Sequence, residues 1–534
     1  MASRVDSDRS GALRGFAHIG AGTMVSRITG FAREIVTAAI FGAGISMDIF
    51  VAAFTIPNLL CRILGETAIE SAFMPLFKGL HAKGEKARAW ALAKGTFRRL
   101  VIVLSGVVLV GIAAAPLLVR VVASGFTGDV AGEAVRMTRL MFPFGLFIGM
   151  AALMGAILLA FRRYRAYSLA PVLLNVGILV SVLVLHGRIG YYSLDVGVLV
   201  GGALQFLVQA PIVRKLLLSD REDPVAAASQ ADAHEDLKRV SGLSVPVILA
   251  AAVQRVGVVV DRTIASFLVP GSISSLYYSF RLVHLPYAIL ALAAGRSVAP
   301  VLAEKHALGD HEGFSRALVT GMRMNVTFLT PVAVLAVVLA RPIVGLIYQR
   351  GAFDETDLAM TASAFAMYSV GLVGMGLTFL LVRAFAARLD TKTPVKVSII
   401  AFFLNVGLNL LLGRTPLRHA GLALASSIAF TVHAVILFVL LNKRLGRSRT
   451  AIAPSELLSL GWRVLLSCAA LTAVFLPLSA WLGMRIAEPL LVGRAVRIVL
   501  AGGVGGAVYL LVSRLLGLHE LTRPLSRGGE ENGA

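Results

Sequence analysis

Ionisable side chains interrupt an apolar stretch near the start of the chain, which reads SRITGFAREIVTAAIFGAGISMDIFVAAFTIPN over residues 26–58. Arg27, Arg33 and Glu34 share its first apolar run. Arg27 and Glu34 are seven residues apart, close to two helical turns, so we expect them on one face of a helix. An ionised side chain in hydrocarbon costs roughly 2.5–3.5 kcal/mol on insertion scales, and such groups normally face a wet cavity lined by protein.

Several arginines facing one cavity predict a site for an anion. Guanidinium groups stay charged and match phosphate oxygens bidentately. Arg62 and Arg281 lie on two further apolar segments and complete the predicted set. In the alternative interpretation, each arginine reaches a membrane interface or pairs for structural reasons with Glu34, Asp48 or Glu66.

Asp48 ends the short turn Gly42–Asp48, before the second apolar run. Aspartate is a good helix N-cap, so one interpretation is that it caps the helix that follows. The other is that it is the partner of an arginine in a gate on the outer side of the membrane.

Asp261 and two asparagines predict a cation site. Asp261 lies beside Arg262 inside an apolar run, and a neighbouring ion pair is one interpretation of it. Asn405 and Asn409 are four residues apart and share a face of a helix. A carboxylate and amide oxygens suit Na⁺ or H⁺ coupling. The asparagines equally suit plain helix–helix contact in a membrane.

The composition is typical of a polytopic helical membrane protein. The 534 residues are 57% hydrophobic and only 15% charged, with a mean hydropathy of +0.82. The apolar runs are about 20 residues or longer, too long for barrel strands, and helices satisfy their own backbone in lipid. The net charge of +22 does not indicate nucleic-acid binding, because the basic residues cluster in loops, as membrane orientation requires.

Hydropathy predicts about fourteen membrane-spanning helices. The links 78–99, 162–165 and 443–449 are rich in Lys and Arg, whereas the turns 43–48 and 268–275 contain neither. The positive-inside rule therefore predicts that both termini are cytoplasmic. The expected segments are 15–42, 49–77, 100–124, 138–161, 168–187, 191–213, 241–267, 272–302, 320–346, 358–386, 394–413, 419–442, 460–483 and 491–516.

An internal repeat divides the chain into two six-helix halves. Three residues of the first half recur in the second with one offset of 229 positions. Parallel repeats of this kind place a substrate site between the halves, near the membrane midplane. The repeated residues are Arg33, Gly42 and Pro57 in the first half and Arg262, Gly271 and Pro286 in the second.

The repeat predicts the domain organisation. Residues 1–217 form an N-terminal lobe with helices one to six, and 218–238 form a charged cytoplasmic linker. Residues 239–444 form a C-terminal lobe with helices seven to twelve. Residues 445–534 carry two extra helices and a cytoplasmic tail.

The chain lacks the motifs G-x-x-x-x-G-K-[ST], H-E-x-x-H, C-x-x-C and G-x-S-x-G. ATPase, zinc and hydrolase chemistry are therefore not expected. We expect no catalytic residue and no cofactor. An ion gradient such as Na⁺, the membrane potential or substrate flux would drive any transport.

Several motifs resemble the MurJ (MviN) family of lipid II flippases, in the multidrug/oligosaccharidyl-lipid/polysaccharide exporter superfamily. They extend over most of the helical array, and many unusual residues agree in order. The motifs are SRITGFAREIVTAAIFGAG (26–44), FTIPN (54–58), ESAFMPLF (70–77), ASFLVPGSISSLYYSFRL (265–282), IYQRGAFD (347–354), AMYSVGL (366–372) and RLDTKTPVKV (388–397).

The resemblance implies roles for individual residues. Arg27, Arg33 and Arg281 match the family's central-cavity arginines, proposed to hold the lipid diphosphate. Glu34 stands where members often have Asp, and Asp48 matches the acidic residue of the outer gate.

The resemblance also extends to the cation site and the last helices. Asp261, Asn405 and Asn409 resemble a sodium site of some members. The two helices within 445–534 resemble a pair that forms a groove for the polyprenyl tail.

The predicted function is transfer of lipid II, an undecaprenyl-diphosphate-linked disaccharide peptide, from the cytoplasmic to the periplasmic leaflet by alternating access. The protein is expected in the bacterial inner membrane, as a monomer, with membrane lipids and the cell-wall synthesis machinery as further partners. The alternatives are a flippase for another polyprenyl-diphosphate glycan, a cation-coupled drug antiporter, a polyprenyl-phosphate glycosyltransferase or a non-transporting scaffold. A basic cavity disfavours the antiporter, and the absence of an acidic metal motif disfavours the glycosyltransferase.

Overall fold

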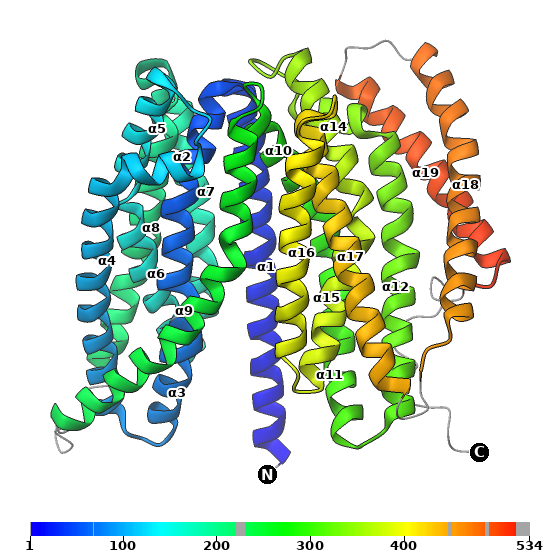
Figure 1. Ribbon diagram of the computed structural model, residues 1–534. Coiled ribbons are helices and arrows are strands. Elements are labelled where there is room, and N and C mark those ends of the chain that lie inside the picture. The colour runs from blue at the N-terminus through cyan, green and yellow to red at the C-terminus, as the bar shows by residue number, and fades with distance from the viewer. Residues whose placement is uncertain (1, 68, 220–229, 447–450, 486–490, 519–534) are drawn as a thin grey trace. The chain divides into compact units, whose positions relative to one another are not determined.

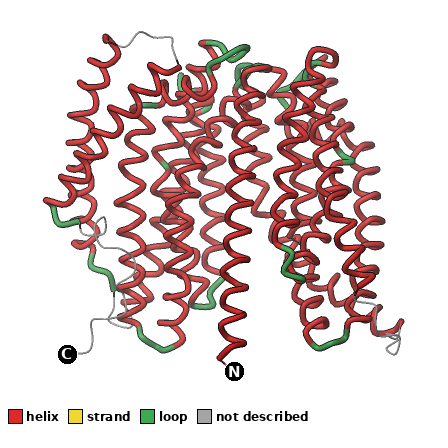
Figure 2. Tube along the Cα trace, turned by 180° about the vertical axis from the view of Figure 1, so that it is seen from behind, coloured by secondary structure: helices red, strands yellow, loops and turns green. Residues whose placement is uncertain are grey.

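The computed structural model describes residues 2–67, 69–219, 230–446, 451–485 and 491–518 (Figure 1). These residues form helices joined by short loops, and no strand occurs among them (Figure 2). Helices satisfy their backbone hydrogen bonds internally, which is what hydrocarbon surroundings demand. The all-helical fold class predicted from composition is confirmed.

Contacts group the chain into two compact units, Met1–Ser274 and Ser275–Ala534. In the first unit the long helices run side by side (Figures 1 and 2). Its elements are α1 (Ala2–Phe41), α2 (Ile45–Cys61), the π-helical turns η1 (Arg62–Thr67) and η2 (Ile69–Phe73), α3 (Met74–Ala82), α4 (Lys86–Val122), α5 (Gly128–Met141), α6 (Phe144–Ala160), α7 (Tyr164–Ile189), α8 (Tyr192–Ser219) and α9 (Gln230–Ser266).

The second unit contains the remaining helices, with the start of the first of them in the first unit. They are α10 (Ser272–Pro286), η3 (Tyr287–Ala291), α11 (Leu292–Ala307), α12 (His311–Val338), α13 (Ala340–Tyr348), α14 (Glu355–Val370), α15 (Leu372–Ala387), α16 (Lys392–Leu412), α17 (Arg418–Gly446), α18 (Pro454–Arg485) and α19 (Leu491–Leu515).

Each of the fourteen expected segments falls on helix in the part of the chain that the structure describes. Five of the segments contain more than one helical element; one of them is α14–α15, which bends by 44°. Of the described helices, ten are long and apolar enough to cross a membrane, or eleven if the bent pair is one span. The count of fourteen spans therefore stays a prediction.

The internal repeat has a structural counterpart. Gly42 (φ 66°) and Gly271 (φ 89°) both adopt the left-handed conformation that glycine tolerates, each just before a helix starts. Pro57 lies inside α2 and Pro286 ends α10, and each of these helices continues into a π-helical turn. A proline removes one backbone donor, and a local widening of the helix accommodates the loss.

Helix α9 begins the second repeat by sequence but packs with the first unit. It contacts α4, α2 and the turns η1 and η2. Arg88 of α4 binds Asp236 of α9 through its Nε, 2.7 Å from Oδ2. The compact units therefore differ from the repeats in the placement of one helix. Part of the expected linker 218–238 lies outside the described residues, and the domain division predicted from the repeats stays a prediction.

Each unit has a core of buried apolar side chains between its helices and further apolar side chains on its outside. Phe77 and Trp90, both largely buried, pack edge to face in the first unit, with ring centroids 5.7 Å apart. Leu109 of α4 and Phe403 of α16 are 69% and 66% exposed. Large apolar side chains facing outward on helices of this length are suited to contact with lipid.

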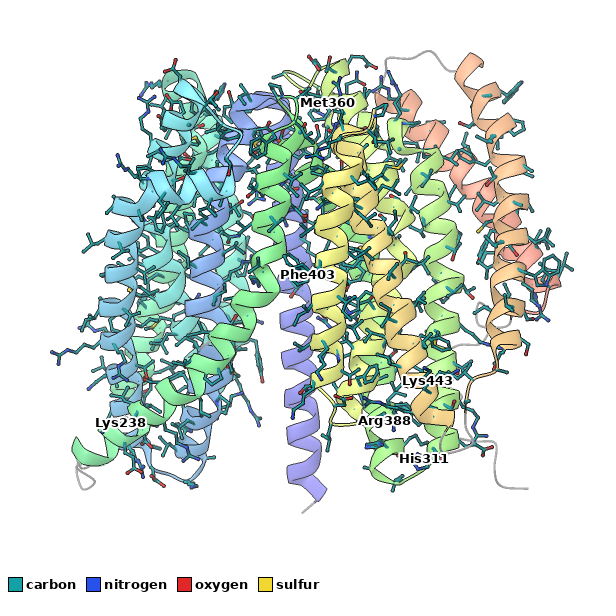
Figure 3. All side chains as sticks on the ribbon, in the orientation of Figure 1. Lys238, His311, Met360, Arg388, Phe403 and Lys443 are labelled. Atoms are coloured by element: carbon teal, nitrogen blue, oxygen red, sulfur yellow. The ribbon has the colours of Figure 1, made fainter. Side chains whose placement is uncertain are left out.

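In the second unit, basic side chains lie near one end of the helices and an apolar side chain lies in the middle. His311, Arg388 and Lys443 lie near one end of its helices, and Met360 lies near the other (Figure 3). Phe403 lies between them (Figure 3). Basic residues at a helix end and an apolar residue in the middle are expected for helices that cross a bilayer.

Candidate functional site

Close packing against α7 fixes the arginine-bearing part of α1. The Asn175 side-chain amide of α7 donates a hydrogen bond to the carbonyl of Ser26, at 3.1 Å. Gly30 passes beside the same asparagine, and a Cβ there would lie 3.2 Å from Asn175 Nδ2. The small residue lets the two helices approach, as in other membrane helix pairs.

Arg33 and Glu34 form an ion pair on α1. Arg33 Nη2 lies 2.9 Å from Glu34 Oε1, and the two side chains are only 15% and 8% exposed. The pairing interpretation made from the sequence therefore holds for these two residues. Arg27, on the same helix, is exposed. On α1, Arg33 is thus held by a carboxylate, whereas Arg27 is exposed.

Arg62 is the first residue of η1, directly after α2. Its side chain is exposed, and its carbonyl accepts a hydrogen bond from the Thr67 hydroxyl at 3.0 Å. That hydrogen bond joins residues five positions apart, the spacing of a π-helical turn. The side chain of Glu66 lies outside the described residues.

Arg281 belongs to the second unit and is exposed on α10. Its guanidinium carbon lies 5.1 Å from the centroid of the Tyr277 ring, one turn earlier. Arg281 Nη2 also lies 3.3 Å from the Tyr277 hydroxyl. A cation over an aromatic face is attracted by the ring quadrupole, so Tyr277 orients this arginine.

Asp48 caps a helix start 223 residues further along the chain. Its Oδ2 accepts from the amide of Gly271, and its Oδ1 accepts from the amide of Ser274, both at 2.7 Å. The Ser274 hydroxyl donates to the same Oδ1, also at 2.7 Å. Asp48 is only 2% exposed. The carboxylate thus satisfies unpaired amides at the start of α10 and complements the positive end of its dipole.

The expectation that Asp48 caps its own helix is wrong. Helix α2 begins at Ile45, Gly44 is its N-cap residue, and no side chain caps it. Asp48 therefore lies in the first turn of α2, and its carboxylate is free to bind a more distant segment. Sequence reasoning missed Gly271 and Ser274 as its partners, although the repeat offset placed Gly271 in register with Gly42.

The residues of the predicted cation site lie in both units. Asp261 is half-buried on α9, in the first unit. In the second unit, Asn409 Nδ2 donates to Asn405 Oδ1 at 3.1 Å, and Asn405 Nδ2 donates to the Ser426 hydroxyl at 3.3 Å. Arg262, next to Asp261, donates to the carbonyl of Ile273 at 3.0 Å. A cation bound by the aspartate and both asparagines stays a prediction.

Asp390, in the loop before α16, is held in its ionised form. Burial opposes the charge of Asp390, but hydrogen bonds from the Thr393 amide and hydroxyl and from Arg444 outweigh it, and its pKa falls to about 2.

Leu389, just before Asp390, has a φ of 60°. Arg162 of the first repeat has a similar φ of 55°. The two halves therefore also share a left-handed turn at this point, with different side chains.

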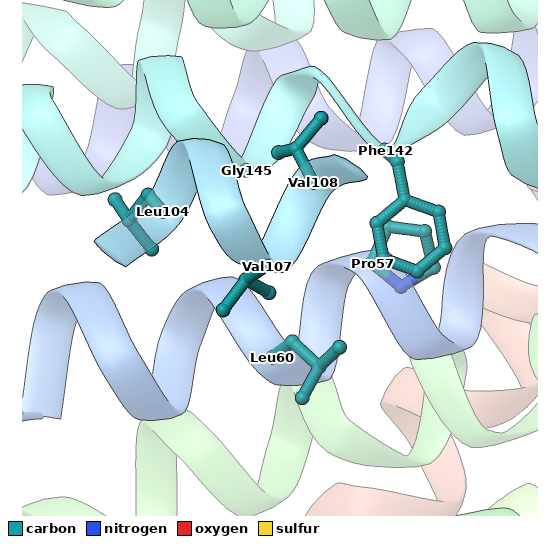
Figure 4. Close-up of a pocket in the computed structure, with 7 residues that line it drawn as sticks. All are labelled: Pro57, Leu60, Leu104, Val107, Val108, Phe142 and Gly145. Carbon is teal, nitrogen blue, oxygen red and sulfur yellow. The ribbon is translucent and has the colours of Figure 1, made fainter. Parts of the chain in front are cut away.

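One small pocket of the first unit is wholly apolar. It lies where α2, α4 and the connection between α5 and α6 meet (Figure 4). No lining side chain of this pocket can bind a charged headgroup. The lining residues are Pro57, Leu60, Leu104, Val107, Val108, Phe142 and Gly145.

The repeated helical fold, the broken helices and the arginines within apolar helices define a polytopic membrane protein of the transporter class. The family model "Lipid II flippase MurJ" matches residues 37–500. The chain belongs to the lipid II flippase MurJ family.

Two relatives extend the match over most of the chain. A lipid II flippase MurJ of Burkholderia cenocepacia is 35% identical over 431 residues, which are 79% of this chain and 82% of the relative. A probable lipid II flippase MurJ of Vibrio cholerae is 31% identical over 525 residues, 94% of this chain and 95% of the relative.

Solved structures share the fold. A lipid II flippase MurJ in an inward closed conformation superposes with a TM-score of 0.74 at 22% identity, over 95% of this chain and 99% of that one. An inward-facing multidrug resistance MATE family transporter of the MOP superfamily gives a TM-score of 0.65 at 15% identity, over 81% of this chain and 96% of that one. The family predicted from the motifs is confirmed.

Proposed function

We propose that this protein transfers lipid II from the cytoplasmic to the periplasmic leaflet of the bacterial inner membrane. Membership of the lipid II flippase MurJ family over residues 37–500 carries the proposal. The diphosphate and the sugar–peptide headgroup cannot cross hydrocarbon unaided, because each polar group without a partner costs several kcal/mol. A protein that supplies replacement partners removes most of that barrier.

In the proposed mechanism, arginines replace the water around the diphosphate. Arg27, Arg33, Arg62 and Arg281 form charge-assisted hydrogen bonds to its oxygens, while the polyprenyl tail stays in lipid. Arg33 is paired with Glu34 at 2.9 Å, so the diphosphate competes with that carboxylate. The two repeats rock and expose the site to each side in turn. No bond is made or broken in the substrate.

Asp48 is the proposed outer gate residue. Its three hydrogen bonds, each 2.7 Å, join α2 to the turn between α9 and α10. Opening toward the periplasm requires that these bonds break and that water replaces them. The carboxylate is therefore expected to favour the state that is closed on the outer side.

Two driving forces are proposed, the membrane potential and a Na⁺ gradient. Asp261, Asn405 and Asn409 are the proposed Na⁺ ligands, since carboxylate and amide oxygens are the ligands that hard cations prefer. We further propose that the protein acts as a monomer, with both termini in the cytoplasm, and that it serves the cell-wall synthesis machinery.

The test is leaflet-resolved transfer of lipid II in reconstituted vesicles. Arg27→Ala should lower the rate by about 10- to 100-fold, because a lost charge-assisted hydrogen bond is worth roughly 1.5–3 kcal/mol. Arg27→Lys should restore part of the rate, since lysine keeps the charge but loses the bidentate fork. Arg98→Ala, at an exposed position of α4, is the matched control and should transfer normally.

Each outcome of this experiment has a separate meaning. No transfer by the unmodified protein, with or without a potential or Na⁺, would contradict the flippase function. Full transfer by Arg27→Ala would contradict the arginine site alone. If other polyprenyl-diphosphate glycans inhibited the transfer of lipid II as strongly as unlabelled lipid II does, a flippase with broader headgroup specificity would be favoured.

A further inference from the structure

Asp195 is a fully buried carboxylate that the proposed transport site does not use. It lies in the first turn of α8, and its exposed fraction is 0%. Among the residues that the structure describes, neither of its carboxylate oxygens has a hydrogen-bond partner. Burying an ionised carboxylate with no partner costs far more than burying the neutral acid. The geometry therefore favours a carboxyl group that holds a proton.

The amides nearest to Asp195 are already engaged. The first turn of a helix normally offers free N–H groups to an acidic side chain. Here the amide of Ser193 donates to the carbonyl of Gly190 at 3.2 Å, and that of Leu194 donates to Tyr191 at 3.0 Å. The Ser193 hydroxyl also donates to Gly190, at 2.7 Å. The local backbone and its serine thus give Asp195 no donor.

Glu133, Arg136, His186 and Arg188 of the neighbouring helices are paired elsewhere or exposed. Helix α8 packs against α5, α6 and α7. On α5, Glu133 pairs with Arg136 and accepts a hydrogen bond of 2.5 Å from the Tyr192 hydroxyl. Helix α6 has no ionisable residue. On α7, His186 Nδ1 contacts a carbonyl of its own helix at 2.9 Å, and Arg188 is exposed. No cation among these residues balances a charge on Asp195.

A proton fits this environment better than a metal ion does. Hard cations take six or more oxygen ligands, whereas a proton needs one. In the described part of the chain, no group of three or more His, Cys, Asp and Glu side chains could hold a metal ion. Beside Asp195, the carbonyls of Gly190 and Tyr191 already accept hydrogen bonds, and the Ser193 hydroxyl donates to Gly190.

We propose that Asp195 is a proton-binding site at the end of the first unit that is expected to face the periplasm. One carboxylate oxygen carries the proton while α5, α6, α7 and α8 are packed as in this structure. When water reaches the side chain, the carboxyl group gives this proton to water and becomes an anion. Opening of this end of the unit is therefore linked to proton release, and closure to proton uptake. This inference does not depend on lipid II being the substrate.

The deciding experiment is infrared spectroscopy of the whole protein in lipid at about neutral pH. A protonated carboxylic acid has a carbonyl stretching band well separated from the bands of ionised carboxylates. The spectrum of the unmodified protein minus that of Asp195→Asn should contain this band. Asp129→Asn, an exposed acid on α5, is the matched control, and its difference spectrum should contain only carboxylate bands.

A carboxylate band, or no band, in the Asp195→Asn difference would overturn the proposal. An ionised Asp195 would mean that water or a cation supplies its partner. A second measurement follows the difference band and the hydrogen exchange of α8 together as the pH is raised. The band should disappear only when the unit opens, so exchange of the α8 amides should rise at the same pH. Loss of the band with unchanged exchange would contradict the link between proton release and opening.

Discussion

Asp48 illustrates how one carboxylate can decide a distant contact. Its oxygens accept two amide hydrogen bonds and one hydroxyl hydrogen bond at the start of α10, each of 2.7 Å. Burial of the aspartate is tolerated because these donors replace its water. The Ser274 Oγ also lies 3.2 Å from the carbonyl oxygen of Gly271, so the serine lies within the turn that Asp48 holds.

We expect Asp48→Ala to release the Gly271 turn. Hydrogen bonds to a charged group contribute roughly 1.5–3 kcal/mol each, so the amides of Gly271 and Ser274 should exchange about tenfold faster or more. Hydrogen exchange with mass spectrometry measures this directly. Ser274→Ala removes only the hydroxyl and should give a smaller increase. Unchanged protection in Asp48→Ala would mean that packing, not the carboxylate, holds the turn.

At the scale of elements, glycines set how closely α7 and α8 approach. A Cβ on Gly177 of α7 would lie 2.6 Å from the Cα of Gly201 on α8, closer than real side chains come to backbone. A Cβ on Gly201 would in turn lie 2.7 Å from the carbonyl oxygen of Leu174. Helix pairs in lipid associate through such close backbone contact, because apolar side chains gain little from leaving the hydrocarbon.

Gly177→Ala should destabilise the first unit by about 1–3 kcal/mol, the usual cost of overpacking. Gly187→Ala is the matched control on the same helix, because no heavy atom lies within 4 Å of a Cβ placed there. It should be neutral or slightly stabilising, since alanine is the better helix former. Thermal unfolding in lipid nanodiscs compares the two. Equal midpoints for both variants would contradict close packing of α7 on α8.

At the scale of the whole molecule, the charge pattern predicts membrane topology. The turn after α3 contains Lys83 and is expected in the cytoplasm, whereas Gly44, just before α2, is expected on the periplasmic side. Neither position is crowded: Lys83 is exposed, and a Cβ on Gly44 has no heavy atom within 4 Å.

Single cysteines at these two positions test the topology, with Cys61 and Cys468 replaced. A membrane-impermeant maleimide added to intact spheroplasts should label Gly44→Cys and spare Lys83→Cys until the membrane is opened. Labelling of Lys83→Cys but not of Gly44→Cys would mean that the helices cross the membrane in the opposite direction. The proposed direction of transfer would then be wrong.

The fold class, the family and the positions of the helices followed from the sequence, because they depend on local properties. Long apolar runs define helices in lipid, whichever neighbours they have. Gly42 and Gly271 likewise indicated the repeat in the sequence, because a left-handed turn favours glycine whatever tertiary contacts it makes. The arginines stood out in the sequence because charge is rare in apolar segments, and their convergence on one site stays a prediction.

Tertiary structure alone decided which groups are partners. The capping of α10 by Asp48, the packing of α9 with the first unit and the burial of Asp195 all depend on segments far apart in the chain. Periodicity reports which face of a helix is apolar, but it carries no information about which distant donor meets that face. For a buried carboxylate, the distant donors decide whether it is an anion that fastens a helix, as at Asp48, or an acid without a partner, as at Asp195.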